Sequence, residues 1–340
     1  MLLASSKTYE TSDFALSTGA LLPTLTVAYE TWGELDAQGN NAILVCHGYT
    51  NHPHAAGEGG WFEPLIGPGE AIDTEKYFVV CSNMLGSAYG TSGPSSTNPE
   101  TGRPYGPDFP KYTTADMVAA QKLLLDHLGI NQLKAVIGYS YGWHLTFLWG
   151  AMHPDRMRAL VPVAGVITRK TTAEEVAKIR ARFEDLPGWN GGHYYGREKE
   201  SGVFDRLVEM RLERLWMYGV GQHLADTVGD AAECERLLTT RATTWAGEFD
   251  ANSLSILYEA GIGSSAERIA GNIKAPLLNV LATTDSVVDV ALGQPTVEML
   301  REKGVDTRFL AIDTPYGHAG PVADWRKWSD DLAAFLDETP

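Results

Sequence analysis

The chain has 340 residues, of which 44% are hydrophobic and 21% are charged, and its formal net charge is −16. This length fits one large domain with an insertion, and the composition is that of an ordinary globular protein. The surplus of acidic residues repels phosphate backbones and anionic lipids, which argues against nucleic acid or a membrane surface as a partner.

The cysteines and the N-terminus bear on the compartment in which the protein works. Cys46, Cys81 and Cys234 cannot all pair within one chain, and their spacing matches no zinc or redox motif. The segment 1–13 lacks the basic flank and apolar core of a signal peptide. No stretch approaches the roughly 20 apolar residues that are needed to cross a bilayer. We therefore expect a cytoplasmic protein.

The first half of the chain alternates between strand and helix patterns. Short apolar or β-branched runs bounded by Gly, Asn or Pro predict strands, and apolar residues at helical spacing predict helices. The predicted strands are 25–31, 42–47, 77–82, 133–138 and 159–164, and the predicted helices are 113–128 and 141–153. Gly129 ends the first helix and Pro154 the second.

The alternation stops between about 168 and 269, where the sequence is charged and helical. Amphipathic helices are predicted at 172–183 and 203–218. The alternation then resumes, with strands at 277–282 and 307–312 and helices at 290–303 and 322–336. This order predicts an α/β domain from residues 1–167 and 270–340, with a mainly parallel sheet and helices on both faces. The helical insertion, residues 168–269, would cover the carboxyl ends of the strands, where such sheets bind ligands.

A G-x-S-x-G motif, Gly138-Tyr139-Ser140-Tyr141-Gly142, lies between the predicted strand 133–138 and the helix that follows it. In an α/β-hydrolase fold this strand–turn–helix context is a nucleophile elbow, which projects the serine hydroxyl from the top of the sheet. The pentapeptide also occurs by chance in ordinary turns, but its context here favours catalysis. We therefore predict an α/β-hydrolase fold with Ser140 as the nucleophile.

A serine nucleophile needs a base, and in this fold the order along the chain is Ser, then Asp or Glu, then His. His318 fits, because it follows the last predicted strand and precedes the last predicted helix. His144 is too near Ser140 on the same helix, His153 ends that helix, and His193 and His223 lie in the insertion.

The orienting acid should follow the strand 277–282 directly. Asp285 does so, and Asp289 is the alternative four residues later; the other role for either residue is to cap a helix. We favour Asp285, which would accept the His318 Nδ1 proton. The fold builds its oxyanion hole from two backbone N–H groups. The sequence assigns these to Tyr141, after the nucleophile, and to Tyr49 in the loop His47-Gly48-Tyr49-Thr50, where His47 is expected to bind within the loop.

Longer runs resemble the homoserine O-acetyltransferase family of the α/β-hydrolase superfamily. They include Gly67-Pro68-Gly69 and Thr101-Gly102-Arg103-Pro104-Tyr105-Gly106, and further runs at 71–74, 77–78, 81–83, 93–96, 98–99, 108–110 and 126–130. The match is closest over 67–142, and weaker resemblance extends over the whole chain, including Asp285 and His318. The resemblance implies a Ser-Asp-His triad, a helical lid and a homodimer joined through lid helices.

The chain departs from this family at the site. Its elbow typically reads Gly-Gly-Ser-Met-Gly-Gly, whereas here Tyr139, Tyr141 and Trp143 surround Ser140. The family's catalytic His is typically followed by an Asp that binds the substrate's amino group, and here that position is Ala319.

The family resemblance also implies a substrate-binding arginine in the insertion. Arg211 resembles the family's carboxylate-binding Arg, seven residues before Tyr218, but Arg206 and Arg214 leave the register open, and a solvated helix face is an equal alternative. We list Arg211, Tyr218, Tyr139 and Trp143 as candidate substrate-binding residues; for the aromatic residues, core packing is the alternative.

We therefore hypothesise an acyl-enzyme on Ser140 and an ester hydrolase acting on small acyl esters such as acetates. The first alternative is an acyl-CoA-dependent O-acyltransferase with acetyl-CoA as co-substrate. The second is a non-catalytic binding protein of this fold. The sequence predicts no metal and no resident cofactor, because the triad needs none and no H-E-x-x-H or comparable cluster is present.

Overall fold

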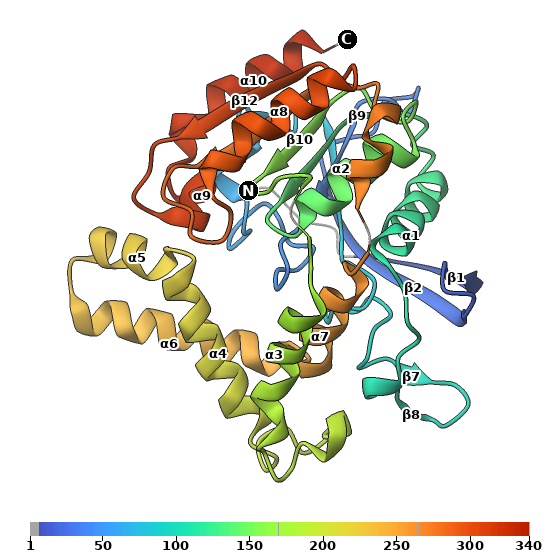
Figure 1. Cartoon of the computed structure of the whole chain (residues 1–340), viewed down its shortest axis with the longest axis vertical. Coiled ribbons are helices and arrows are strands. Elements are labelled where there is room, and N and C mark those ends of the chain that lie inside the picture. Colours follow the sequence, from blue (N-terminus) through green and yellow to red (C-terminus); the bar gives the residue numbers. More distant parts are fainter. Residues whose placement is uncertain (1–6, 169, 264, 340) are drawn as a thin grey trace.

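The computed structural model describes residues 7–168, 170–263 and 265–339. The first six residues, part of the segment that was considered as a signal peptide, lie outside this description. Eight strands of the described chain form one sheet in the order β1-β2-β6-β3-β9-β10-β11-β12 (Figure 1). Their bounds are β1 Lys7–Ala15, β2 Leu21–Trp32, β3 Ala42–Cys46, β6 Phe78–Ser82, β9 Leu133–Tyr139, β10 Leu160–Val163, β11 Leu277–Ala282 and β12 Thr307–Ile312.

The six strands from β6 to β12 in this order are parallel, and β1 and β2 pair antiparallel at one edge. The sequence analysis did not predict β1. Its side chains are mostly exposed, so it shows no apolar run, and its pairing with β2 defines it instead. Two short two-stranded sheets lie in the loops, β4 Ile66–Gly67 with β5 Ile72–Asp73, and β7 Thr97–Asn98 with β8 Arg103–Pro104.

Helices cover both faces of the sheet, which confirms the predicted fold class. The helices of the core are α1 Thr114–His127, α2 Gly142–Met152, α8 Gly293–Glu302, α9 Gly320–Ala323 and α10 Ser329–Glu338. Alternate residues of each strand enter two separate clusters: Leu44 packs with the α1 and α2 side, and Ile43 with the α10 side. Cys46 and Cys81 are buried within the sheet.

The last predicted helix, 322–336, is wrong as a continuous element. The chain forms α9, then a 3₁₀ turn at Trp325–Lys327, then α10. The break falls at Trp328, whose φ of −148° is not helical. Its fully buried indole donates a hydrogen bond of 2.8 Å to the Pro321 carbonyl, so tertiary packing overrides the local helical pattern. The predicted helix 290–303 likewise begins as a 3₁₀ turn, Val290–Leu292, before α8.

Five α-helices lie between β10 and β11 and gather at one end of the sheet (Figure 1). They are α3 Ala173–Glu184, α4 Val203–Met217, α5 Val220–Val228, α6 Ala231–Glu248 and α7 Ala251–Ala260. The sequence predicted only α3 and α4 individually. Helix α7 was missed because it is buried on almost every side and carries polar residues throughout, so it shows no amphipathic stripe.

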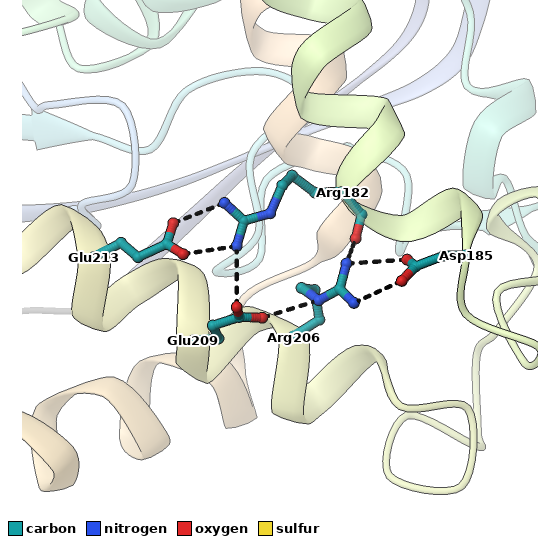
Figure 2. A network of polar contacts seen from close by, with 5 residues as sticks. All are labelled: Arg182, Asp185, Arg206, Glu209 and Glu213. Atoms are coloured by element: carbon teal, nitrogen blue, oxygen red, sulfur yellow. Dashed lines mark hydrogen bonds and ion pairs between the residues drawn. The ribbon is translucent and has the colours of Figure 1, made fainter.

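A network of ion pairs joins α3 to α4 (Figure 2). Arg182 binds Glu213 through two hydrogen bonds of 2.7 and 2.9 Å, and Arg206 binds both Asp185 carboxylate oxygens at 3.1 Å. Glu209 connects the two arginines, at 3.6 Å from Arg182 and 3.0 Å from Arg206. Arg206 therefore has a structural role on one face of α4. In the described part of the chain, no helix is both long and apolar enough to cross a membrane.

Candidate active site

Ser140 occupies a sharp turn between the end of β9 and the start of α2. Its φ is +52°, a left-handed conformation that few non-glycine residues adopt. The Ser140 N–H donates to the Val163 carbonyl at 3.0 Å, and its own carbonyl accepts from the Trp143 N–H at 2.9 Å. Gly142 is required, because a Cβ there would lie 2.1 Å from the Cys46 carbonyl oxygen. This geometry fits a nucleophile elbow.

The structure brings Ser140, His318 and Asp285 together in one chain of hydrogen bonds. The distance from His318 Nε2 to Ser140 Oγ is 2.7 Å, and that from His318 Nδ1 to Asp285 Oδ2 is also 2.7 Å. The side chains of His318 and Asp285 are 3% and 0% exposed. Such an arrangement can remove the serine proton while the carboxylate holds the imidazole in one tautomer.

Asp285 is fixed by the loop that follows β11. Its second oxygen, Oδ1, accepts hydrogen bonds from the N–H groups of Val287 at 2.7 Å and Val288 at 3.2 Å. The alternative acid, Asp289, instead caps the 3₁₀ turn at 290–292 by accepting from the Ala291 N–H at 2.9 Å. The geometry therefore favours Asp285 as the partner of His318.

Two tyrosines hold the loop that carries His318. The Tyr139 hydroxyl donates to the His318 carbonyl at 2.8 Å, and the N–H of Ala319 donates to the Tyr218 carbonyl at 2.8 Å. The Tyr218 ring also lies 5.1 Å from the His318 ring. Tyr139 thus supports the histidine from behind and does not line the cavity beside Ser140. Sequence reasoning did not identify this supporting role, because it depends on a contact between residues 179 positions apart.

The two residues assigned to the oxyanion hole lie beside Ser140. A Cβ placed on Gly48 would be 3.4 Å from the Ser140 Cβ, so the loop with Tyr49 contacts the nucleophile. Within the described residues, neither the Tyr49 nor the Tyr141 N–H donates a hydrogen bond to another group of the chain. Both are thus free to bind a developing oxyanion.

Helix α7 of the insertion fixes both tyrosine side chains. The Tyr49 hydroxyl donates to the Leu254 carbonyl, and the Tyr141 hydroxyl donates to the Leu257 carbonyl one turn later. Asp250 caps the N-terminus of α7 through the Ser253 N–H at 2.7 Å, and also accepts from Tyr194 and Tyr195. The insertion therefore positions the candidate oxyanion hole, although its residues are distant in sequence.

His47 is not placed to act as a base. Its Nδ1–H donates to the Gly48 carbonyl at 2.8 Å, and its Nε2 accepts from the Met84 N–H at 3.1 Å. Burial lowers the pKa of His47 to about 4, so the ring is neutral at pH 7. Its two hydrogen bonds fix the start of the loop that carries Tyr49.

The cavity beside Ser140 is small, with a volume of about 30 Å³. Its lining residues are Tyr49, Ser140, Tyr141, Trp143, His144, Ala164, Tyr218, Tyr258, Val287, Val288 and His318. Trp143 and Tyr218 thus line the cavity, as candidate substrate-binding residues should. None of the described lining residues is an Asp or Glu. No cluster of three or more His, Cys, Asp or Glu in the described residues is arranged to hold a metal ion.

Arg211 and Arg214 lie on the face of α4 that meets the loop 47–50, away from the network that contains Arg206. Arg211 donates to Thr50 Oγ1 at 2.8 Å, and the Arg214 guanidinium lies 4.9 Å from the centre of the Tyr49 ring. No described carboxylate lies within ion-pair distance of either arginine. Burial lowers the pKa of Arg211, as expected for a desolvated cation. Arg214 thus packs on the Tyr49 ring and Arg211 binds the next residue, Thr50, and neither arginine lines the cavity.

Comparison with known proteins gives one consistent result. A family model described as alpha/beta hydrolase fold matches residues 41–298. The homoserine O-acetyltransferase of Moorella thermoacetica is 37% identical over 365 residues, covering 99% of this chain and 97% of that protein. The corresponding enzyme of Symbiobacterium thermophilum is 37% identical over 355 residues, covering 95% of this chain and 91% of that protein.

Solved structures with similar folds include members named for both activities. The crystal structure of an esterase is similar with a TM-score of 0.86 and 27% identity, covering 98% of this chain and 100% of that chain. The homoserine O-acetyltransferase of Bacillus anthracis is similar with a TM-score of 0.85 and 25% identity, covering 100% of this chain and 99% of that chain.

We predict that Ser140→Ala lowers the turnover of any acyl substrate by at least about 10⁴-fold, because it removes the nucleophile. Thermal unfolding should change little, since alanine keeps the Cβ of the elbow. The measurement is kcat, together with labelling by a serine-directed fluorophosphonate. A wild-type protein that does not label would support the non-catalytic alternative.

We predict that Tyr49→Phe and Tyr141→Phe each lower kcat roughly 10-fold with little change in KM. Losing the bond to α7 loosens the N–H donor, and a complete oxyanion donor contributes 10²–10³ in rate. Tyr112→Phe is the matched control, because the Tyr112 hydroxyl is buried without a hydrogen-bond partner in the described chain. Equal kcat in all three variants would contradict the role assigned to α7.

We predict that stability falls between pH 6.5 and pH 4 because of His47. The unfolded histidine has a pKa of 6.5 and the folded one a pKa of about 4, so its contribution is complete above pH 6.5 and is lost as the pH falls through 4. The loss is at most roughly 3 kcal/mol. His47→Asn should flatten the dependence of unfolding free energy on pH, measured by urea titration; an unchanged slope would assign the acid sensitivity elsewhere.

Proposed function

The chain belongs to the homoserine O-acetyltransferase family of α/β-hydrolase-fold proteins, and from this we propose that it transfers acyl groups through Ser140. We further propose that water is its acceptor. The protein would then be a hydrolase of small carboxylic esters, acetate esters above all.

In the proposed mechanism, Ser140 Oγ attacks the ester carbonyl carbon while His318 Nε2 takes its proton. The charge on the carbonyl oxygen is stabilised by the N–H groups of Tyr49 and Tyr141. His318 then gives the proton to the leaving alcohol, and the acyl group remains on Ser140 as an ester. Water attacks this acyl-enzyme, His318 takes the proton from water, and the carboxylic acid leaves as the proton returns to Ser140. Asp285 stabilises the imidazolium in both halves.

The observation that supports water as the acceptor is the absence of a carboxylate from the described lining of the cavity. In the family that this chain resembles, an Asp after the catalytic His binds the amino group of homoserine. Here Ala319 holds that position, 7% exposed and fixed by its bond to Tyr218. A desolvated ammonium without a counter-charge costs about 3–5 kcal/mol, which disfavours an amino acid acceptor.

The size of the cavity supports a short acyl group. At about 30 Å³ the cavity beside Ser140 is small, which favours a short acyl group over a long chain. In this proposal Trp143 and Tyr218 contact the substrate directly, and Arg211 supports the loop 47–50 through Thr50.

The second candidate is an acetyl-CoA-dependent O-acetyltransferase. It is favoured by the curated relatives named homoserine O-acetyltransferase, at 37% identity over almost the whole chain. The two candidates share the acyl-enzyme and differ only in what accepts the acyl group. We also propose, from the family resemblance, a homodimer formed through the insertion. Trp216 and Met217 of α4, 52% and 51% exposed, support such a contact.

We predict that the wild-type protein releases acetate from p-nitrophenyl acetate and shows no CoA release that depends on homoserine when it is given acetyl-CoA. Acetate, free CoA and O-acetylated products would be followed by mass spectrometry. If homoserine-dependent CoA release appears, the hydrolase proposal is wrong, and a residue other than the missing Asp binds the amino group.

We predict that Ala319→Asp produces homoserine-dependent CoA release that the wild type lacks, because it supplies the missing counter-charge. Ala319→Asn is the matched control, since it has nearly the same shape without the charge. An equal effect of both substitutions would show that charge at this position does not select the acceptor.

A further inference from the structure

Trp143 lies flat against a backbone segment that has no room for a side chain. A Cβ placed on Gly165 would be 1.8 Å from Trp143 Cδ1 and 2.4 Å from its Nε1. The indole therefore occupies the space that any other residue at 165 would fill. This packing brings the segment after β10 and the first turn of α2 into direct contact beside Ser140.

The backbone that contacts the indole is held by hydrogen bonds from β11. Asn279, which is fully buried on β11, donates hydrogen bonds to the carbonyls of Gly165 at 2.9 Å and Pro162 at 3.1 Å. Ala164 lines the cavity and has a φ of +54°, a strained conformation for a residue with a side chain. Its N–H donates to the Val280 carbonyl at 2.8 Å. The floor of the cavity is thus held rigidly by β11.

The opposite face of the indole is also occupied. The His144 ring lies 3.5 Å away in a stacked arrangement, and Phe147 meets the indole edge-on at 6.1 Å. The side chain of Trp143 is only 4% exposed, so it has no open space into which to swing. It forms a fixed wall of the cavity of about 30 Å³ that also contains Ser140 and His318.

We propose that Trp143, held against Gly165, sets the upper limit on the length of the acyl group that Ser140 accepts. An acyl group of two or three carbons fits in front of the indole, and longer chains are excluded by it. This inference rests on the proposed acylation of Ser140 and adds the residue that determines its acyl specificity. It holds for either acceptor, because hydrolase and transferase share the same acyl-enzyme.

The test compares kcat/KM for p-nitrophenyl acetate and p-nitrophenyl hexanoate in the wild type, Trp143→Phe and Trp143→Ala. Each newly buried CH₂ group contributes about fourfold in binding, so the four extra CH₂ groups of hexanoate should raise the hexanoate-to-acetate ratio by up to about 250-fold in Trp143→Ala. Trp143→Phe, which opens less space and disturbs packing less, should give a smaller rise in the same direction.

Two further variants separate the role of Trp143 from a general loosening of the packing around the active site. Trp61→Ala is the matched control, because Trp61 stacks on Tyr139 at 5.9 Å and does not line the cavity; its ratio should equal that of the wild type. Gly165→Ala, whose Cβ would collide with the indole, should disturb this wall of the cavity and lower acetate hydrolysis. Combining it with Trp143→Ala should restore that hydrolysis, which gives a strong coupling between the two positions.

An unchanged ratio in Trp143→Phe and Trp143→Ala, with thermal unfolding showing both folded, would overturn the inference. So would a rise of the same size in Trp61→Ala. A wild-type protein that hydrolyses no ester would be assayed by CoA release from acetyl-CoA and hexanoyl-CoA, and the same ratio and the same variants apply. No reaction with either donor and no fluorophosphonate labelling would refute the proposed function itself, which is a distinct outcome.

Discussion

The left-handed backbone of Ser140 is the constraint on which the rest of the site depends. A residue with a side chain is held at φ +52° only because Gly142 lets α2 begin directly against the Cys46 carbonyl. The turn raises the hydroxyl above the ends of the parallel strands. His318 and Asp285 reach it from the loops after β12 and β11. Parallel pairing brings these loops to one edge, so the sheet determines which distant residues can meet the serine.

The insertion is part of this site and does more than cover it. Helix α7 binds the hydroxyls of Tyr49 and Tyr141 through carbonyls one turn apart, while Tyr218, at the end of α4, binds the N–H of the residue after His318. The core thus supplies the candidate reacting groups, and the insertion determines where the candidate oxyanion donors and the histidine loop rest. The ion pairs between α3 and α4 lie mostly at the surface, where each contributes at most about 1 kcal/mol, so they orient the helices more than they stabilise the fold.

The features that the sequence predicted correctly are those that depend on residues close together in the chain. Strand ends, the G-x-S-x-G turn and the order of Ser140, Asp285 and His318 are readable because each residue directly follows a predicted strand. The remaining features depend on tertiary contacts. Strand β1 exists through its pairing with β2, and the helix break at Trp328 through packing of its indole. The sequence left open which arginine of α4 faces the site. Arg206 joins the network of Figure 2, whereas Arg211 and Arg214 contact Thr50 and Tyr49.

The fate of an acyl group on Ser140 depends on whether an alcohol is held long enough to exclude water. Water needs no binding site, whereas an alcohol must gain enough binding energy to compete with it. For an amino alcohol, most of that energy would come from pairing its ammonium with a carboxylate. The described lining of the cavity offers none, and Ala319 is a buried methyl group beside His318. The proposed function therefore lets the same fold and the same triad serve transfer or hydrolysis, and assigns the balance between them to the side chain next to the base.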